Sequence, residues 1–303
     1  MNTAPPLTVR ELIRRIEQRF NDAGLYFGHG TDNALDEAAW LVGSALQLAP
    51  HELDAHLEDR PTPAQQNAIR ALVEKRINTR QPLAYLLKEA WFAGLKFYVD
   101  ERVIVPRSLT AEFIVEQFHP WIDPARIHRI LDLCTGSGCM AIACAYAFPE
   151  ARVEAADISE AALAVARINV ENHGQQGRVQ LLHSDLFSGL AGARYDLIVT
   201  NPPYVARAEM QTLPPEYRHE PALALASGAQ GLDAVTRILA AAPSHLNPGG
   251  ILVAEVGNSA ASLQEKFPSA PFTWLTTATG DESVLLLTAE QLRQHHAAFA
   301  PTR

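Results

Sequence analysis

The first ninety residues carry apolar side chains at helical spacing. Residues 12–20 repeat apolar positions three and four apart, behind Thr8 and a glutamate three residues later, which is the spacing of a capping box. A second helical stretch ends at Pro50, and a third begins at Thr62. The pattern predicts a small helical bundle over residues 1–90, with the expected role of holding a partner or covering a site.

The pattern becomes β-type beyond residue 90. Residues 91–99 and 102–105 are rich in aromatic and β-branched side chains and are separated by Asp100-Glu101, which predicts a β-hairpin linker over residues 91–107. Such a hairpin is either a plain connector between domains or one wall of an active site. A helix is then expected to begin near Ser108.

Strands and helices alternate over residues 108–303. Five short apolar runs, each followed by a helical segment, predict the parallel strands of an α/β domain. These runs cover residues 129–133, 152–156, 179–182, 197–199 and 251–255. Two last β segments, 272–277 and 283–288, are close enough to form an antiparallel terminal hairpin.

The first of these strands runs directly into a glycine turn at Gly136 and Gly138. Glycine permits a positive φ and a close backbone approach, so this turn and the N-terminus of the following helix can bind a ligand. The next strand ends in Asp157, where a carboxylate can accept hydrogen bonds from both hydroxyls of a ribose. The glycine turn together with Asp157 predicts a nucleotide-type cofactor. By themselves these two features fit NAD as well as any other nucleotide-type cofactor.

Two further strand ends carry polar residues over the same crevice. Asp185 follows the third strand, where it either accepts an adenine N–H or caps a turn. The fourth strand ends in Asn201-Pro202-Pro203-Tyr204, whose prolines lack an N–H, so that the loop presents oxygen acceptors beside an aromatic ring. The Asn201 side-chain oxygen and the Pro202 carbonyl suit a planar group bearing NH2, on which Tyr204 can stack. The Pro-rich segment 207–220 that follows has the length of a substrate-facing loop.

Composition narrows the classes of function. The chain has 303 residues, 34 acidic against 25 basic side chains and a net charge of −9, without a Lys/Arg-rich run. This balance disfavours a duplex nucleic-acid substrate and suits a small molecule or a basic protein partner. The three cysteines are five residues apart, which is no metal-binding spacing, and we expect reduced thiols and no metal. Neither a signal peptide nor an apolar stretch of transmembrane length is visible, so a cytoplasmic protein with no membrane partner is expected.

Over nearly its full length the chain resembles the protein glutamine N5-methyltransferases, which use S-adenosyl-L-methionine. The matching segments are Gln81 to Leu87, Val105 to Arg107, Asp132 to Gly138, Asp157, Asp185, Asn201 to Tyr204 and Glu220 to Leu225. The resemblance implies a Rossmann-like methyltransferase sheet over 108–303, mostly parallel with an antiparallel terminal hairpin. It also implies that the N-terminal helical bundle recognises substrate.

Two branches of this family differ in their substrates. One modifies peptide release factors and the other a glutamine on the third protein of the large ribosomal subunit. Residues 91–108, 133–139 and 255–259 resemble the ribosomal-protein branch, whereas the release-factor branch more often has glycine in place of Cys134. The alternatives are a release-factor methyltransferase, a nucleic-acid amino (adenine or guanine) methyltransferase that uses the same tetrapeptide, and a non-enzymatic ribosome-assembly factor.

The resemblance also implies a role for each candidate residue. Those expected around the cofactor are Asp132, Thr135, Gly136, Gly138, Asp157, Asp185 and Asn201, and those expected around the amide substrate are Asn201, Pro202, Pro203, Tyr204 and Arg107. Asp132 either reaches the amino group of the cofactor or makes a structural hydrogen bond at its strand end, and Arg107 either braces the site or contacts substrate. Glu112 is given no role, because the residues after Ser108 depart from the family pattern.

Overall fold

The computed structural model describes residues 7–300, which form two compact units. The helical unit comprises the described chain up to Glu89 together with Pro214–His219. The sheet unit comprises Ala90–Leu213 and the described chain from Glu220 onward. A short stretch from the second half of the sequence is therefore part of the N-terminal unit.

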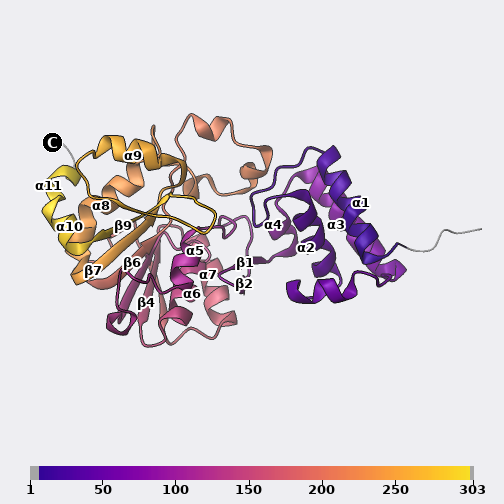
Figure 1. The fold of residues 1–303 in the computed structure, drawn as a ribbon, viewed down its shortest axis with the longest axis horizontal. Helices are drawn as coiled ribbons and strands as arrows, with labels where there is room; N and C mark the ends of the chain where they lie inside the picture. The colour runs from indigo at the N-terminus through magenta and orange to yellow at the C-terminus, as the bar shows by residue number, and fades with distance from the viewer. Residues whose placement is uncertain (1–6, 301–303) are drawn as a thin grey trace, which may run out of the picture. The chain divides into compact units, whose positions relative to one another are not determined.

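The helical unit contains the three predicted helices (Figure 1). Its elements are α1 (Val9–Asp22), α2 (Ala34–Ala45), the 3-10 helix η1 (Pro50–His56), α3 (Pro63–Thr79), the short α4 (Leu83–Leu87) and the 3-10 helix η4 (Pro215–His219). The predicted capping box is confirmed: the Glu11 N–H donates to the Thr8 hydroxyl at 3.2 Å and the Thr8 N–H donates to the Glu11 carboxylate at 2.8 Å. Ile13, Ile16 and Phe20 pack in the core of this unit, as their spacing predicts. The short helix α4 was not predicted from the sequence.

The strand pairing predicted within 91–107 is wrong. The hairpin consists of β1 (Ala90–Phe92) and β2 (Leu95–Phe97) and turns at Ala93 and Gly94, which both have positive φ, as a two-residue hairpin turn requires. Residues 102–105 form no strand. Instead, the Asp100 carboxylate accepts hydrogen bonds from the Arg102 N–H at 3.1 Å and from its guanidinium at 2.8 and 2.6 Å, which closes a local turn.

The sheet unit is built on seven strands, mainly parallel, as predicted. They are β3 (Arg129–Leu133), β4 (Arg152–Asp157), β5 (Val179–His183), β6 (Tyr195–Thr200), β7 (Leu246–Glu255), β8 (Thr273–Leu275) and β9 (Val284–Thr288). Their order is β5-β4-β3-β6-β7-β9-β8, with β9 antiparallel to both neighbours. The mixed α/β fold with a terminal antiparallel hairpin is confirmed.

Helices cover both faces of this sheet (Figure 1). The helices of the sheet unit are α5 (Thr110–Val115), η2 (Pro124–Arg126), α6 (Cys139–Ala147), α7 (Glu160–Asn172), η3 (Glu209–Gln211), η5 (Ala222–Ala224), α8 (Asp233–His245), η6 (Gly257–Ser259), α9 (Ala260–Lys266), α10 (Ala289–Gln294) and α11 (His296–Phe299). Ile130 packs in the core that contains α6, while its neighbour Leu131 packs in the core that contains α8, because successive side chains of a strand point to opposite faces. The helices α10 and α11 were not predicted from the sequence.

The strand order places the switch point of the sheet between β3 and β6. From β3 the chain moves outward through β4 to β5 and then returns to add β6 on the other side of β3. Leu133, the last residue of β3, is paired with Thr200, the last residue of β6. Ligands of open α/β sheets bind at such a point, outside the carboxyl ends of the strands. The glycine turn and the Asn-Pro-Pro-Tyr loop therefore begin side by side.

Over residues 7–300, no helix is both long and apolar enough to cross a membrane.

Candidate active site

A cavity of about 320 Å³ opens at the carboxyl ends of the parallel strands, wholly within the sheet unit. Its wall includes residues that follow each of the four strands β3 to β6, and of the predicted site residues it includes Gly136, Asp157, Asp185, Asn201 and Pro203. The volume lies in the range of small-molecule sites. Five of the candidate residues are thus brought to one cavity, although 67 positions separate Gly136 from Pro203 in the chain.

The glycine turn and the end of β4 are joined by the Asp157 carboxylate. It accepts one hydrogen bond from the Gly136 N–H and another from the Ser159 N–H, both at 2.9 Å. Burial raises the pKa of Asp157, against the opposing effect of these two donors. Each carboxylate oxygen can accept more than one hydrogen bond, so the group retains acceptor capacity toward the cavity. Gly136 has a φ of +55° and open space where a Cβ would point.

Gly138 serves a different purpose from Gly136. It precedes α6 with a φ of +80°, and a Cβ at this position would lie 3.2 Å from the Cβ of Ala166 in α7. The glycine thus allows the turn to pack closely on α7, and it does not line the cavity. This is the helix-packing role of a late glycine in a dinucleotide-type turn.

Asp132 and Thr135 lie behind the turn rather than in the cavity wall. The Asp132 Oδ2 accepts from the Thr135 hydroxyl at 2.5 Å and from the Ala141 N–H at 2.9 Å, which fixes the turn to the start of α6. Its Oδ1 is buried and has no hydrogen-bond partner among the described residues. Of the two alternatives for Asp132, this geometry favours the structural hydrogen bond at the strand end.

Burial raises the pKa of Asp132 to about 7, with the Thr135 hydroxyl and the Ala141 N–H opposing the effect. An unfolded aspartate has a pKa of about 3.9, so the folded state binds more protons between about pH 4 and pH 7. The contribution of this group to the free energy of unfolding therefore falls as the pH rises through that window. We predict that Asp132→Asn loses less stability than the wild type when the pH rises from about 5 to about 8, by a few kcal/mol. Urea unfolding at both pH values measures this difference, and equal pH dependence in the two proteins would contradict it.

Asp185 carries an ion pair that the sequence did not reveal. The Arg237 guanidinium of α8 donates to its Oδ2 at 2.9 Å, and both side chains are about half exposed and line the cavity. Because Arg237 lies 52 positions away in an amphipathic helix, no local signal marks it as a site residue. The pair holds the Asp185 carboxylate at the rim of the cavity.

The four residues of the Asn-Pro-Pro-Tyr loop have different surroundings. Asn201 and Pro203 are partly buried and line the cavity, while Pro202 is buried outside the lining. The loop continues β6, whose last residue Thr200 is fixed by a hydrogen bond from its hydroxyl to the Leu133 carbonyl at 2.6 Å. Asn201 is therefore presented from a strand end that is tied to β3.

Tyr204 is held in a cradle of backbone and polar contacts. Its carbonyl accepts from the Ser259 hydroxyl at 2.8 Å, and its own hydroxyl lies 3.5 Å from a carboxylate oxygen of Glu255. Two glycines lie against it: a Cβ at Gly257 would be 2.4 Å from the ring, and a Cβ at Gly231 would be 2.1 Å from the carbonyl oxygen. The segment Glu255 to Ser259 was identified from the sequence only as a mark of the family branch, and its structural role was missed.

Gly257→Ala is expected to displace the Tyr204 ring and to lower turnover by up to about 10²-fold with cofactor affinity unchanged, because small misplacements of positioning groups are costly. Steady-state kinetics and calorimetry with the cofactor measure the two effects. Gly280→Ala is the matched control, since Gly280 also has a positive φ but has open space around a Cβ. Wild-type turnover in Gly257→Ala would show that the ring position is unimportant.

Arg107 braces the backbone of the sheet unit. Its guanidinium donates to both carboxylate oxygens of Glu220 at 2.5 and 2.8 Å, and the Val105 N–H donates to the same carboxylate at 2.9 Å. Of the two roles expected for Arg107, this geometry favours bracing. Glu112 accepts a hydrogen bond from the Ala278 N–H at 2.8 Å and so anchors the turn between β8 and β9.

The three cysteines are free thiols whose pKa values are raised by burial. Across residues 7–300, no three His, Cys, Asp or Glu side chains gather in a way that could hold a metal ion.

Comparison with known proteins adds to this geometry. Residues 110–214 match the family model of the methyltransferase small domain, and residues 11–87 match that of the PrmC N-terminal domain. The fold is similar to that of the hMettl16 catalytic domain crystallised in complex with MAT2A 3'UTR hairpin 6, with a TM-score of 0.50 and 16% identity over 75% of this chain and 81% of that one.

Curated relatives are similar to this chain over almost the whole length of both proteins. The chain is 49% identical over 286 residues to the ribosomal protein uL3 glutamine methyltransferase of Neisseria meningitidis serogroup B, covering 94% of each protein. It is 50% identical over 286 residues to that of Bordetella pertussis, covering 94% of this chain and 96% of the relative. It is 47% identical over 302 residues to that of Burkholderia pseudomallei, covering 96% and 98%.

Proposed function

The chain belongs to the family of ribosomal protein uL3 glutamine methyltransferases, and from this we propose that it methylates the side-chain nitrogen of a glutamine of uL3, with S-adenosyl-L-methionine as methyl donor. The observation that carries the proposal is the placement of Asn201 in the same cavity wall as Gly136 and Asp157. With this arrangement, Asn201, which is expected to bind the amide, lies in the same cavity as the groups expected to bind the cofactor.

The residues around the cavity fit S-adenosyl-L-methionine. The open space at Gly136 accommodates the methionine end against exposed backbone, the Asp157 carboxylate suits the ribose hydroxyls, and Asp185 suits the adenine end at the rim. Asp132, Thr135 and Gly138 support this site indirectly by fixing the turn and its helix. When bound, the cofactor supplies an electrophilic methyl group.

Asp157→Ala is expected to weaken cofactor binding by about 10- to 100-fold, since it removes acceptors of hydrogen bonds and loosens the Gly136 turn. Isothermal titration with the cofactor measures the change in Kd. Glu160→Ala provides the control, because this neighbouring carboxylate is exposed and is not part of the cavity wall. Unchanged affinity in Asp157→Ala would remove the ribose role.

Methylation of an amide needs the nitrogen to be held, since its lone pair is delocalised into the carbonyl and it is a poor nucleophile. Asn201 Oδ1 and the Pro202 carbonyl would accept the two N–H bonds and orient the nitrogen toward the methyl group. These acceptors bind more strongly as the nitrogen gains positive charge, which stabilises the transition state more than the ground state. Tyr204, fixed by its cradle, would keep the amide plane in position. The proton becomes acidic only after transfer, so no prior base is required.

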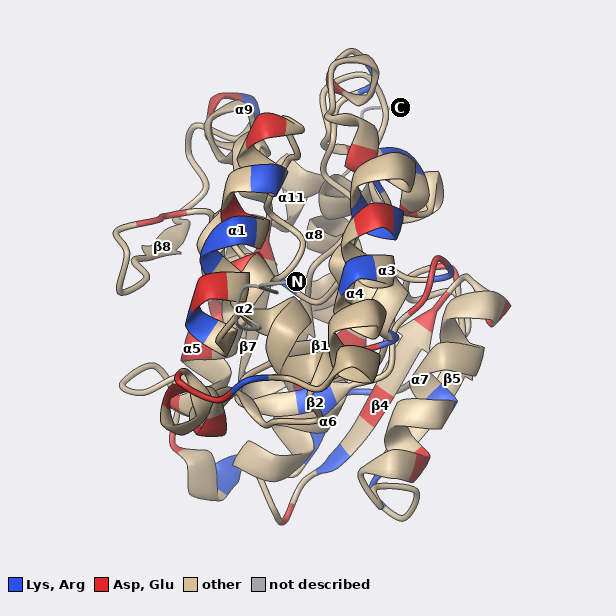
Figure 2. Ribbon diagram, turned by 90° about the vertical axis from the view of Figure 1, so that its right-hand side faces the viewer, with Lys and Arg blue, Asp and Glu red and all other residues tan. Residues whose placement is uncertain are grey.

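The helical unit is proposed to recognise the protein substrate. Its surface carries charges of both signs, as along α1 (Figure 2), rather than a basic stripe of the kind that binds nucleic-acid phosphates. The net charge of −9 suits a basic protein surface.

The test is to incubate the protein with labelled cofactor and, separately, purified uL3, a peptide release factor, or ribosomal RNA. Label that is transferred to uL3, resists nuclease, is removed by protease and maps to one glutamine by peptide mass analysis is the expected result. Label that follows the release factor or the RNA would contradict the uL3 assignment. Binding of uL3 without any methyl transfer would instead favour an assembly factor.

A further inference from the structure

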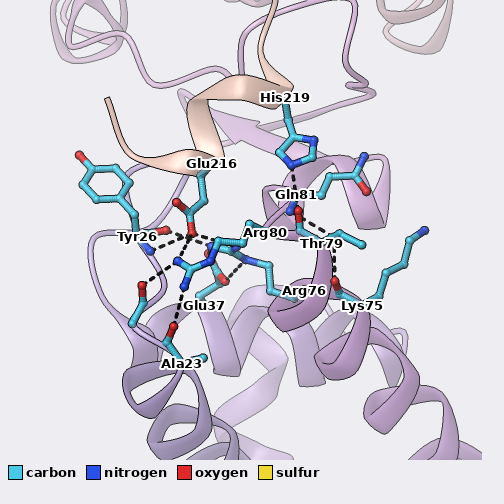
Figure 3. Close-up of polar contacts among 11 residues, drawn as sticks. Ala23, Tyr26, Glu37, Lys75, Arg76, Thr79, Arg80, Gln81, Glu216 and His219 are labelled. Atoms are coloured by element: carbon cyan, nitrogen blue, oxygen red, sulfur yellow. Dashed lines mark hydrogen bonds and ion pairs between the residues drawn. The ribbon is translucent and has the colours of Figure 1, made fainter. Parts of the chain in front are cut away.

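The chain passes between the two units within the loop that follows the Asn-Pro-Pro-Tyr motif. It leaves the sheet unit after Leu213, contributes Pro214–His219 to the helical unit, and re-enters the sheet unit at Glu220. We refer to Pro214–His219 as the docked segment. It contains η4 and is drawn across the helical unit in Figure 3.

The two ends of this loop are joined inside the sheet unit. Val205 forms a parallel bridge with Ala226, its N–H donates to the Leu225 carbonyl at 2.8 Å, and its carbonyl accepts from the Ser227 N–H at 2.9 Å. Val205 directly follows Tyr204, and Ala226 and Ser227 line the cavity. The loop therefore starts directly after the Asn-Pro-Pro-Tyr motif, and its two ends are hydrogen-bonded to each other. Its returning end is part of the cavity wall.

The docked segment is fixed by the buried carboxylate of Glu216, whose side chain is 0% exposed. Its Oε1 accepts from the Tyr26 N–H at 3.1 Å and from the Arg80 guanidinium at 3.2 Å, and it lies 3.6 Å from Nη1 of Arg76 (Figure 3). Burial alone would raise the pKa of Glu216, but the Tyr26 N–H and the two arginines lower it below its usual value. The carboxylate is thus charged, and its other oxygen, Oε2, is buried with no hydrogen-bond partner among the described residues.

The partners of Glu216 are Arg76 in α3, Arg80 directly after α3, and the Tyr26 N–H in the loop between α1 and α2. Arg76, 0% exposed in α3, donates to Glu37 of α2 at 2.8 Å, and Arg80 donates to the Ala23 and Gly24 carbonyls at the end of α1, both at 2.7 Å. Two arginines and two glutamates thus form a cluster with no net charge. The docked segment supplies one of the two glutamates, so the cluster is complete only when this segment is in place. Ion pairs of this kind contribute more to geometric specificity than to stability.

A second set of contacts fastens the end of the docked segment. His219 Nε2 lies 3.0 Å from the Thr79 carbonyl, within the helical unit. The next residue, Glu220, is held by Arg107 and the Val105 N–H in the sheet unit. Two consecutive residues therefore make their contacts in different units, which places the boundary of the docked segment between them.

We propose that the docked segment is the means by which the helical unit sets the position of this loop, and that Glu216 and Arg80 are positioning residues for the protein substrate. The proposal rests on the proposed function. A glutamine side chain needs only the Asn-Pro-Pro-Tyr motif, whereas a folded protein substrate must also meet the loop that starts there. The turns after β3 and β4 that are expected to bind the cofactor lie outside this loop, but Pro221, Leu223 and Ala224, by which the loop returns, line the same cavity, so cofactor affinity should depend on the loop less than recognition of uL3 does.

The test compares Arg80→Met, Arg80→Lys and Glu216→Gln with the wild type, using uL3 as substrate. Arg80 is 32% exposed, so its variants are expected to fold even if Glu216→Gln does not. Arg80→Met should raise KM for uL3 by about tenfold or more with a clearly smaller change in the cofactor Kd, and Arg80→Lys should recover part of the loss. Trypsin should cleave the Arg80→Met variant faster after Arg207 and Arg218, which are exposed residues of the loop. Arg10→Met, which breaks an exposed ion pair of the same unit, is the matched control.

The outcomes separate this proposal from the proposed function. Absence of uL3 methylation by the wild type would refute the function itself. Methylation by the wild type together with unchanged KM and unchanged cleavage in Arg80→Met would overturn the positioning role alone. Equal increases of KM in Arg80→Met and Arg80→Lys, or a loss of cofactor affinity as large as the loss for uL3, would also overturn it. A charge-dependent contact that positions the loop for the protein substrate predicts neither result.

Discussion

Asn201→Ala is expected to lower kcat about 10²- to 10³-fold while the cofactor binds with wild-type affinity, the size of effect seen when one polar group that stabilises a transition state is removed. The reason is that Asn201 Oδ1 is the side-chain acceptor that the cavity offers beside the Asn-Pro-Pro-Tyr prolines. The cofactor is expected to be held by Gly136, Asp157 and Asp185, which the substitution leaves intact. Single-turnover kinetics with uL3 and calorimetry with the cofactor provide the two measurements.

Asn247→Ala is the matched control for this experiment. Asn247 donates to Asp196 at 2.7 Å, at the opposite end of β6 from Asn201, and does not line the cavity. Its loss should leave kcat unchanged. An Asn201→Ala protein that loses cofactor affinity in proportion to kcat would show that Asn201 binds the cofactor rather than orienting the amide.

The sequence was sufficient for the sheet and for the location of the cavity because both depend on local signals. Buried parallel strands appear as apolar runs, and the residue directly after such a run lies at the carboxyl edge of the sheet. Gly136, Asp157, Asp185 and Asn201 each lie within three residues of the end of such a run, and all line one cavity. The sequence also indicated the antiparallel terminal hairpin, which the pairing of β8 with β9 confirms.

The hairpin over residues 91–107 was mispredicted because two competing turns looked alike. Asp100-Glu101 has turn chemistry, but it closes on Arg102 through side-chain hydrogen bonds and does not reverse the strand. The actual reversal at Ala93-Gly94 requires a positive φ at alanine, which sequence rules disfavour. The position of the strand reversal therefore does not follow from local turn preferences.

The cradle of Tyr204 and the docked segment could not be predicted for a different reason. Gly257 contacts a residue 53 positions away, and Glu216 pairs with side chains about 140 and 136 positions away. Such contacts leave no periodic or local pattern. A single glycine or glutamate in a loop is ordinarily a turn or a solvated residue, so only the folded structure distinguishes these two.

Glu216 and Gly257 show a common arrangement around the Asn-Pro-Pro-Tyr motif. The motif itself is short, and its geometry depends on contacts supplied from later parts of the chain: η6 holds Tyr204 in the sheet unit, and the docked segment holds the loop that follows. Because neither contact involves Gly136 or Asp157, which are expected to bind the cofactor, their loss should affect amide positioning and protein-substrate recognition more than cofactor binding.

Arg76→Met is expected to destabilise the helical unit by about 3–5 kcal/mol, the cost of breaking a buried ion pair from one side. Arg76 is fully buried, and its removal leaves the carboxylates of Glu37 and Glu216 in the core with Arg80 as the remaining cation. Urea unfolding followed by far-UV circular dichroism measures the loss. Arg10→Met, whose partner Glu58 is 75% exposed, should cost less than about 1 kcal/mol.

The pH dependence of the Arg76→Met variant gives the sharper test. Without Arg76, burial should raise the pKa values of Glu37 and Glu216 in the folded state above those in the unfolded chain, so that stability falls as the pH rises through this interval. The variant should therefore lie closer to the wild type at about pH 5 than at about pH 8. Adding Glu37→Met should recover part of the loss at the higher pH, since the second substitution removes the buried carboxylate whose partner Arg76 is gone, while Glu216 keeps Arg80. A loss that is independent of pH and unaffected by the second substitution would mean that Arg76 contributes through packing of its aliphatic chain rather than through its charge.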